Sequence, residues 1–320
     1  MQLLTRREWI TSTAGLFGAM SVSNSPAAES GLITDIVDAH VHIWTADTEK
    51  YPLAPGFTTQ DLWYPSFSAE ETIEHGRAAG VNRFNLIQMT WYGLDHSYII
   101  DVIANDPEHF VGTGIVPALT DVALPSPDRT MVALAEHGVY AFRLRGRSRV
   151  TRRWMDFPGY DRMFAAGTEH NLALSFLMGP SDLPEVSRMC TKYPDTPVIL
   201  DHFAGVGARN RFVEEEIQAL CRMAEHRRVM VKFGGFYARG RAEPPYLDML
   251  PLMRRIVDAF GPERCMWESD APKQVKDGHT FEAAVAIIRD HADFLSAADK
   301  HQILVKTAED FFFKRQGTAI

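Results

Sequence analysis

From residue 31 onward, short apolar runs alternate with longer polar runs along the chain. Several of the apolar runs contain almost no polar position, as in Val198-Ile199-Leu200. Continuous apolarity of this kind is typical of strands that are buried on both faces of a parallel sheet. The pattern predicts such strands at residues 35–43, 82–88, 111–116, 140–145, 172–178, 197–202, 229–234 and 265–270.

The polar runs between the strands are rich in alanine, glutamate and arginine, which favour helices. Helices are predicted at residues 69–79, 128–136, 183–192, 214–226, 246–259, 280–291 and 300–313. Repeated strand–helix units in one chain predict an α/β protein, a single-domain (β/α)8 TIM barrel. The competing fold is a doubly wound open sheet. That fold would need a glycine-rich phosphate turn after an early strand, and the sequence has none.

The first residues have a different pattern. Arg6 and Arg7 precede a mildly apolar stretch at residues 14–22, and Ser25-Pro26-Ala27 has the small-x-small form of a cleavage site. This order of basic, apolar and small residues is that of a secretory signal, and the paired arginines resemble a twin-arginine signal. Residues 1–27 are therefore predicted to be a signal peptide and residues 28–320 the barrel, so we expect an exported, periplasmic protein.

Composition narrows the classes of partner. The 320 residues are 46% hydrophobic and 23% charged, as in an ordinary globular protein. The net charge of −8 argues against a nucleic acid, and outside the N-terminus no apolar run is long enough to span a membrane. Three distant cysteines, at 190, 221 and 265, make neither a disulfide framework nor a zinc knuckle. We expect a small-molecule substrate, and the oligomeric state stays open.

Polar residues gather where three of the predicted strands end, which is where TIM barrels carry their chemistry. The first strand ends with His40 and His42, and side chains two apart point to the same face of a strand. The sixth strand ends with His202 and the eighth with Asp270. Three imidazoles and a carboxylate at one barrel mouth suit zinc or a similar divalent ion.

Three segments around these residues resemble the amidohydrolase superfamily. They are Ile36-Val37-Asp38-Ala39-His40-Val41-His42-Ile43-Trp44, Asp201-His202-Phe203-Ala204-Gly205 and Trp267-Glu268-Ser269-Asp270-Ala271-Pro272. The likeness covers about residues 33–313. More narrowly, the chain is similar to the amidohydrolase-2 type of TIM-barrel hydrolase, nearest to the sugar-lactone and 2-pyrone-4,6-dicarboxylate lactonases. The resemblance implies a hydrolase that opens a sugar-acid or dicarboxylate lactone.

The sequence also departs from that family pattern. The fifth predicted strand, at 172–178, lacks the histidine that many metal-dependent members carry, and Arg143 or Arg145 stands where two-metal members use a carboxylated lysine. Glu268 and Gly234 stand where glycine and serine are expected. The resemblance then leaves two alternatives: a metal-free site, or one divalent ion, zinc or similar, held by His40, His42, His202 and Asp270.

The resemblance implies a role for each of these residues in water attack on the lactone. Asp270 is the general base toward water and then returns the proton to the leaving alkoxide. A bound metal would polarise the carbonyl. In a metal-free site, protonated His40, His42 or His202 would hold the charge that develops on the carbonyl oxygen.

Four further residues are candidates for substrate binding. Arg143 and Arg145 share one face of the fourth strand, and arginine pairs bidentately with carboxylates. The alternative for this pair, and for Lys232 on the seventh strand, is a structural ion pair with a neighbouring strand. Gln88, at the end of the second strand, is a candidate hydrogen-bond partner of the substrate. Loop aromatics either stack on a sugar ring or pack in the core; they are Trp91, Tyr92, Trp154 and Tyr237.

Two other functions compete with lactone hydrolysis. One is metal-dependent, non-oxidative decarboxylation in the same superfamily, which typically uses a fifth-strand histidine and a firmly held zinc ion. The other is a non-catalytic binding barrel, which would have no need of a base at Asp270.

Overall fold

The computed structural model describes residues 33–117, 125–147, 151 and 153–314. The predicted signal peptide, residues 1–27, lies outside the described residues. Within the described ranges, no helix is both long enough and apolar enough to cross a membrane.

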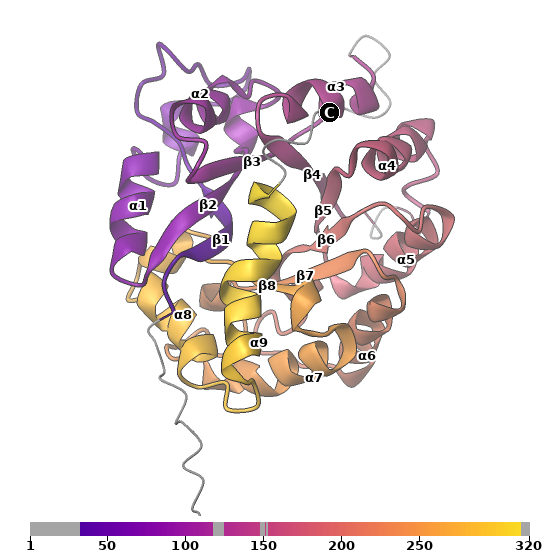
Figure 1. Cartoon of the computed structure of the whole chain (residues 1–320). Helices are drawn as coiled ribbons and strands as arrows, with labels where there is room; N and C mark the ends of the chain where they lie inside the picture. Colours follow the sequence, from indigo (N-terminus) through magenta and orange to yellow (C-terminus); the bar gives the residue numbers. More distant parts are fainter. Residues whose placement is uncertain (1–32, 118–124, 148–150, 152, 315–320) are drawn as a thin grey trace, which may run out of the picture. The chain divides into compact units, whose positions relative to one another are not determined.

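Eight parallel strands form one sheet in chain order (Figure 1). They are β1 (Ile36–His42), β2 (Val81–Ile87), β3 (Phe110–Gly114), β4 (Val139–Arg145), β5 (Ala173–Leu177), β6 (Val198–Leu200), β7 (Val229–Phe233) and β8 (Cys265–Trp267). The end of β8 returns to β1, because the amide of His42 donates to the carbonyl of Ala271 and the amide of Asp270 donates to the carbonyl of His40, each at 2.9 Å. The predicted TIM barrel is confirmed.

Helices follow the strands around the barrel. They are α1 (Ala69–Arg77), α2 (Ser97–Asn105), α3 (Pro127–Ala135), α4 (Pro158–His170), α5 (Leu183–Lys192), α6 (Glu214–Arg222), α7 (Leu250–Phe260), α8 (Phe281–Arg289) and α9 (Ala297–His301). Many begin with a recognisable signal: Ser68 and Glu71 form a capping box at α1, and α3, α4, α5 and α7 carry proline in their first turn.

The predicted helix at 300–313 is divided. It starts as α9 and continues through two π-helical turns, Gln302–Lys306 and Glu309–Phe313. Figure 1 shows this segment, in yellow, against β1 and β8. Its Phe311 and Phe312 pack into one buried cluster with small and medium side chains of the strands, namely Val37, Ala39, Val111, Ala141, Ala173, Ile199 and Met266. The C-terminal segment therefore fills the end of the barrel where the strands begin.

The interior turns polar two residues further along most of these strands. Alternate residues of a strand share a face, so each polar side chain stands above an apolar one of the cluster. This buried polar layer comprises Thr113, Ser175, Asp201 and Glu268, together with Asn85 and Lys232 from β2 and β7. It is the floor on which the site is built.

Candidate active site

A cavity of about 550 Å³ lies at the carboxyl ends of the strands. Every strand contributes a residue at or just beyond its end: His42, Gln88, Ile115, Arg145, Leu177, His202, Gly235 and Asp270. Of the residues predicted for the site, Arg143 also lines the cavity, whereas His40 and Lys232 are fully buried beside it. Chain segments more than 200 residues apart thus supply one pocket.

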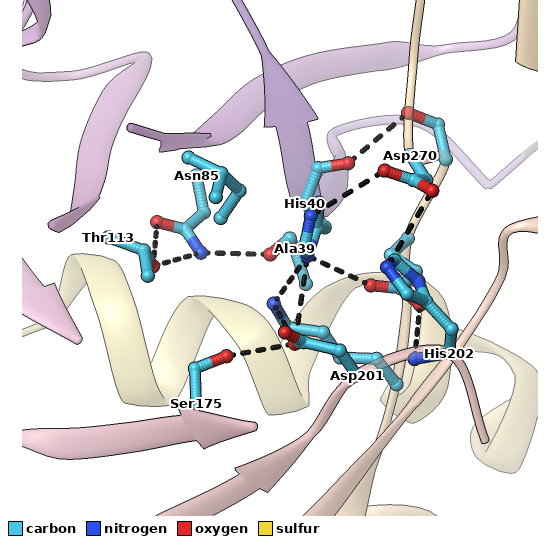
Figure 2. A network of polar contacts seen from close by, with 12 residues as sticks. Ala39, His40, Asn85, Thr113, Ser175, Asp201, His202 and Asp270 are labelled. Atoms are coloured by element: carbon cyan, nitrogen blue, oxygen red, sulfur yellow. Dashed lines mark hydrogen bonds and ion pairs between the residues drawn. The ribbon is translucent and has the colours of Figure 1, made fainter. Parts of the chain in front are cut away.

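The structure brings the three predicted histidines and Asp270 together, and Figure 2 shows His40, His202 and Asp270 of this set. Nε2 of His40 lies 3.3 Å from Nε2 of His42. One oxygen of Asp270, Oδ1, lies 3.4 Å from Nε2 of His42 and 3.6 Å from Nε2 of His40. The other, Oδ2, lies 3.6 Å from Nε2 of His202. The same ring nitrogen of each histidine therefore faces the carboxylate.

Backbone conformation aims two of these side chains inward. His202 and Asp270 come directly after short strands and have φ angles of 50° and 61°, in the left-handed region. Such a conformation costs a non-glycine residue roughly 1–3 kcal/mol and persists where the surroundings hold it. Here the amide of His202 donates to Glu268 Oε1 at 2.9 Å, and the amide of Asp270 donates to the carbonyl of His40.

The carboxyl group of Asp270 is ionised in the cavity. Burial raises the pKa of its carboxyl, but the attraction of His202, the hydrogen bond from His42 and the other nearby imidazole outweigh burial and hold the pKa well below its usual range. Asp270 is thus a carboxylate throughout the neutral range. It can accept a proton without further activation.

The histidines divide into two kinds. Burial lowers the pKa of His40 and His42, and the positive charge of Arg143 lowers it further, so both rings are neutral. Burial acts in the same direction on His202, but the charges of Glu268 and Asp270 outweigh it and raise the pKa of that ring. His202 is consequently the histidine most readily protonated in the site.

The donor set fits one divalent metal ion. One oxygen or nitrogen from each of His40, His42 and Asp270 lies within 4.8 Å of the others. Ligand atoms around a tetrahedral zinc ion at about 2.0–2.1 Å are roughly 3.3–3.4 Å apart, close to the separations seen here. Nδ1 of His42 faces the carbonyl of Ile87 at 3.2 Å, so the tautomer with the proton on Nδ1 would offer the Nε2 lone pair to a metal in place of the hydrogen bond from Nε2 to Asp270. Nη1 of Arg143 lies 3.3 Å from that Nε2 and would compete for it.

Lys232 is an interior ion-pair partner and does not line the cavity. Its Nζ lies 3.0 Å from Asp201 Oδ1 and 3.1 Å from Nδ1 of His40, and its side chain is fully buried. Asp201 also accepts a 2.8 Å hydrogen bond from Ser175 Oγ (Figure 2). Of the two interpretations open for Lys232, this position favours the structural ion pair over a substrate contact.

Arginines dominate the charge of the cavity wall. Among the residues that the structure describes, Arg143, Arg145, Arg147 and Arg239 line it, against one carboxylate, that of Asp270. Burial, and then the neighbouring Arg143, lower the pKa of Arg145. Positive charge therefore collects at this pocket in a chain whose net charge is −8. Such a pocket attracts anions.

Gln88 also lines the cavity, but the NH₂ group of its side chain is already hydrogen-bonded within the protein. Its Nε2 donates to the carbonyl of Asp95 at 2.6 Å, while Oε1 is buried with no hydrogen-bond partner among the described residues. That oxygen is the atom of Gln88 that is free to accept a hydrogen bond from a ligand.

Several residues of the site were not predicted. Asp201 and Glu268 carried a usable signal, since a charged residue inside an apolar strand run is seldom buried without a partner. Trp63 comes from a loop and carried none; it lines the cavity with Lys273 Nζ 4.2 Å from its ring centre. Tyr237 was named only as a loop aromatic, and its contact with Asp270 was not foreseen. The other loop aromatics are buried packing residues, namely Trp91, Tyr92 and Trp154.

Comparison with known proteins places these observations in a family. The model of the amidohydrolase family (Amidohydro_2) matches residues 37–314. An L-fucono-1,5-lactonase from Burkholderia ambifaria is 26% identical over 76% of this chain and 82% of its own length. A 4-sulfomuconolactone hydrolase from Hydrogenophaga intermedia is 23% identical over 73% of this chain and 74% of its own.

Among solved structures, a probable 2-pyrone-4,6-dicarboxylic acid hydrolase from Acinetobacter baumannii has a similar fold. It superposes with a TM-score of 0.70 at 18% identity, covering 87% of this chain and 99% of that one. The family match runs from the second residue of β1 to residue 314 and includes every residue of the site described above. This chain belongs to the amidohydrolase family and is an enzyme of that family.

Proposed function

We propose that this enzyme hydrolyses a lactone that carries a negatively charged group, with Asp270 as the general base. The observation that carries the proposal is the pairing of an ionised, buried Asp270 with a cavity wall of four arginines. The names of the two curated relatives support lactone hydrolysis, and one of those names describes a sulfonated lactone.

The reaction follows from the positions of the side chains. Asp270 removes a proton from a water molecule, and the water oxygen attacks the lactone carbonyl. The negative charge that forms on the carbonyl oxygen is held by hydrogen bonds from the site, for which the doubly protonated ring of His202, through its Nε2–H, is the best placed donor. Asp270 then gives its proton to the ring oxygen as the carbon–oxygen bond breaks.

These contributions are large enough for an ester. General-base action is worth about 10²–10⁴ in rate, and a preorganised donor to the oxyanion about 3–4 kcal/mol. A divalent ion held by His40, His42 and Asp270, with His202 beside them, would add Lewis-acid polarisation of the carbonyl. The arginines bind the anionic group of the substrate and fix which carbonyl faces Asp270.

The test is proton release by the purified protein against two sets of lactones, neutral aldonolactones and lactones that carry a carboxylate, each with and without a chelator. We expect hydrolysis, with the higher kcat/KM for the carboxylated set. Chelator sensitivity would report a working metal. No hydrolysis in either set, combined with carbon dioxide release from carboxylated substrates, would replace the proposal with decarboxylation.

We also propose export through the twin-arginine route, from the sequence of residues 1–27 alone. The double substitution Arg6→Lys and Arg7→Lys should retain the protein in the cytoplasm. Normal export of that variant in cell fractionation would rule out this route.

A further inference from the structure

The buried carboxylate of Glu268 contacts two histidines of the site from below. Its Oε1 accepts hydrogen bonds from both the amide and the ring Nδ1 of His202, at 2.9 and 2.6 Å. Its Oε2 lies 3.3 Å from Nδ1 of His40 and has no hydrogen-bond partner among the described residues. Glu268 is fully buried and does not line the cavity, so it acts only through its neighbours.

We propose that Glu268 is a positioning residue for His202: it holds the ring proton on Nδ1 so that Nε2 is the atom presented to Asp270 and the substrate. A carboxylate oxygen can only accept, so the short contact to Nδ1 requires a proton there. The second bond, to the amide of the same residue, fixes the strained backbone from which the ring projects. Orientation of an imidazole by a carboxylate behind it is a recurrent device in catalytic and metal sites.

The neighbouring strand is adapted to this side chain. Gly234 follows β7, beside Glu268, and a Cβ at position 234 would overlap the backbone oxygen and the Cγ of Glu268. Two of the positions at which the sequence departs from the expected family residues, glycine for serine at 234 and glutamate for glycine at 268, therefore meet in space. The departures form one structural unit behind His202.

The first measurement uses the unaltered protein and no substrate. Long-range ¹H–¹⁵N NMR of the histidine rings, at a pH where His202 is neutral, reports which nitrogen carries the proton. The His202 signals are identified by their absence in His202→Gln. We expect the Nδ1–H form; the Nε2–H form in the wild-type protein would overturn the proposal whether or not a Glu268 variant folds.

The second measurement uses variants, and its kinetic arm rests on the proposed lactonase activity. Glu268→Ala should give a mixture of ring tautomers at His202 and lower kcat about 10–100-fold with KM within about twofold. Glu268→Gln, whose amide oxygen still accepts from Nδ1, should keep the tautomer and recover part of kcat. Glu185→Gln is the matched control, because Glu185 is another buried glutamate that accepts a backbone amide, from Met155, away from the site.

The outcomes separate this proposal from the proposed function. An unchanged tautomer and unchanged kcat in Glu268→Ala would overturn the positioning role. If the His202 tautomer changes in Glu268→Ala but the wild-type protein hydrolyses no lactone, the positioning role of Glu268 is supported and only the lactonase proposal is refuted.

Discussion

The phenol of Tyr237 donates a 2.5 Å hydrogen bond to Oδ2 of Asp270, the same oxygen that faces His202. Burial, and then the negative charge of Asp270, raise the pKa of Tyr237, so the phenol stays protonated and remains a donor. Asp270 is therefore held on one side by a neutral hydroxyl and on the other by imidazoles. The contact joins the loop after β7 to the loop after β8, and it leaves the carboxylate little freedom to rotate.

Tyr237→Phe should lower kcat about tenfold, equivalent to about 1.4 kcal/mol, because the carboxylate loses one of its orienting bonds. A hydrogen bond to the ionised form lowers the pKa of a carboxyl, so its loss should move the acid limb of the kcat/KM profile to higher pH. Tyr246→Phe is the control, since Tyr246 is buried nearby but bonds to Gln274 and His279. Equal pH profiles for the two variants would contradict this role of Tyr237.

Asp270→Asn should reduce kcat by at least about 10²–10⁴, the usual value of a general base. Asparagine tolerates the left-handed backbone of this position, so the fold should persist. Circular dichroism and thermal unfolding of the variant should match those of the wild-type protein. Activity within a few-fold of wild type would refute the assignment of the base.

Arg145→Gln should raise KM for a carboxylated lactone about tenfold and leave KM for a neutral lactone within about twofold, because an arginine–carboxylate contact is worth roughly 1.5–3 kcal/mol at best and is partly screened here. Arg227→Gln is the control: Arg227 pairs with Asp195 on the surface and does not line the cavity. The wild-type preference for charged lactones should also shrink as salt is added. A KM change of the same size for both substrates would mean that Arg145 contributes to the shape of the pocket but does not recognise the charge of the substrate.

Glu309 should stabilise the C-terminal segment at neutral pH and lose that effect in acid. Burial raises the pKa of its carboxyl, but Arg83, Lys314 and Lys306 outweigh burial and lower the pKa from 4.5 to about 2. A depressed carboxyl pKa contributes stability above the unfolded value, and the contribution disappears as pH falls from 4.5 toward 2. Glu309→Gln should therefore cost about 1 kcal/mol of unfolding free energy at pH 7 and less at pH 3.

Urea unfolding of wild type and variant at both pH values checks this, with Glu169→Gln as the exposed control, whose side chain is 76% accessible. A difference between wild type and Glu309→Gln that stays constant from pH 7 to pH 3 would show that the charge of Glu309 is not what stabilises the segment.

Much of the barrel and part of the candidate site could be predicted from the sequence, because these features depend on the local pattern of apolar and polar residues. The apolar runs that predict β1 to β8 are contiguous, and His40, His42, His202 and Asp270 each end such a run. The register shift of β1 between Asp38 and Val41 could not be read, because it depends on pairing with β2. It changes the alternation of β1 without separating His40 from His42.

The contacts that sequence reasoning missed join distant segments of the chain. Tyr237 reaches Asp270 across 33 positions, and Glu268 reaches His202 across 66. Lys232 was ambiguous for the same reason. Its partner, Asp201, directly follows the adjacent strand β6, and only the pairing of the strands in three dimensions shows that the two side chains meet below the cavity. The helical pattern likewise predicted a helix at residues 300–313, but it did not indicate which part of the barrel that segment covers.

That last segment has a consequence for how the enzyme is made. Phe311 and Phe312 are synthesised after all eight strands, yet they complete the apolar packing at the strand beginnings. A growing chain that has released every strand still exposes Ala39, Ala141 and Ala173 at an unfilled opening. The barrel can therefore reach its final packing only once translation has passed residue 312, so an mRNA truncated shortly before that codon should yield a chain that carries every catalytic residue and is nevertheless prone to aggregation.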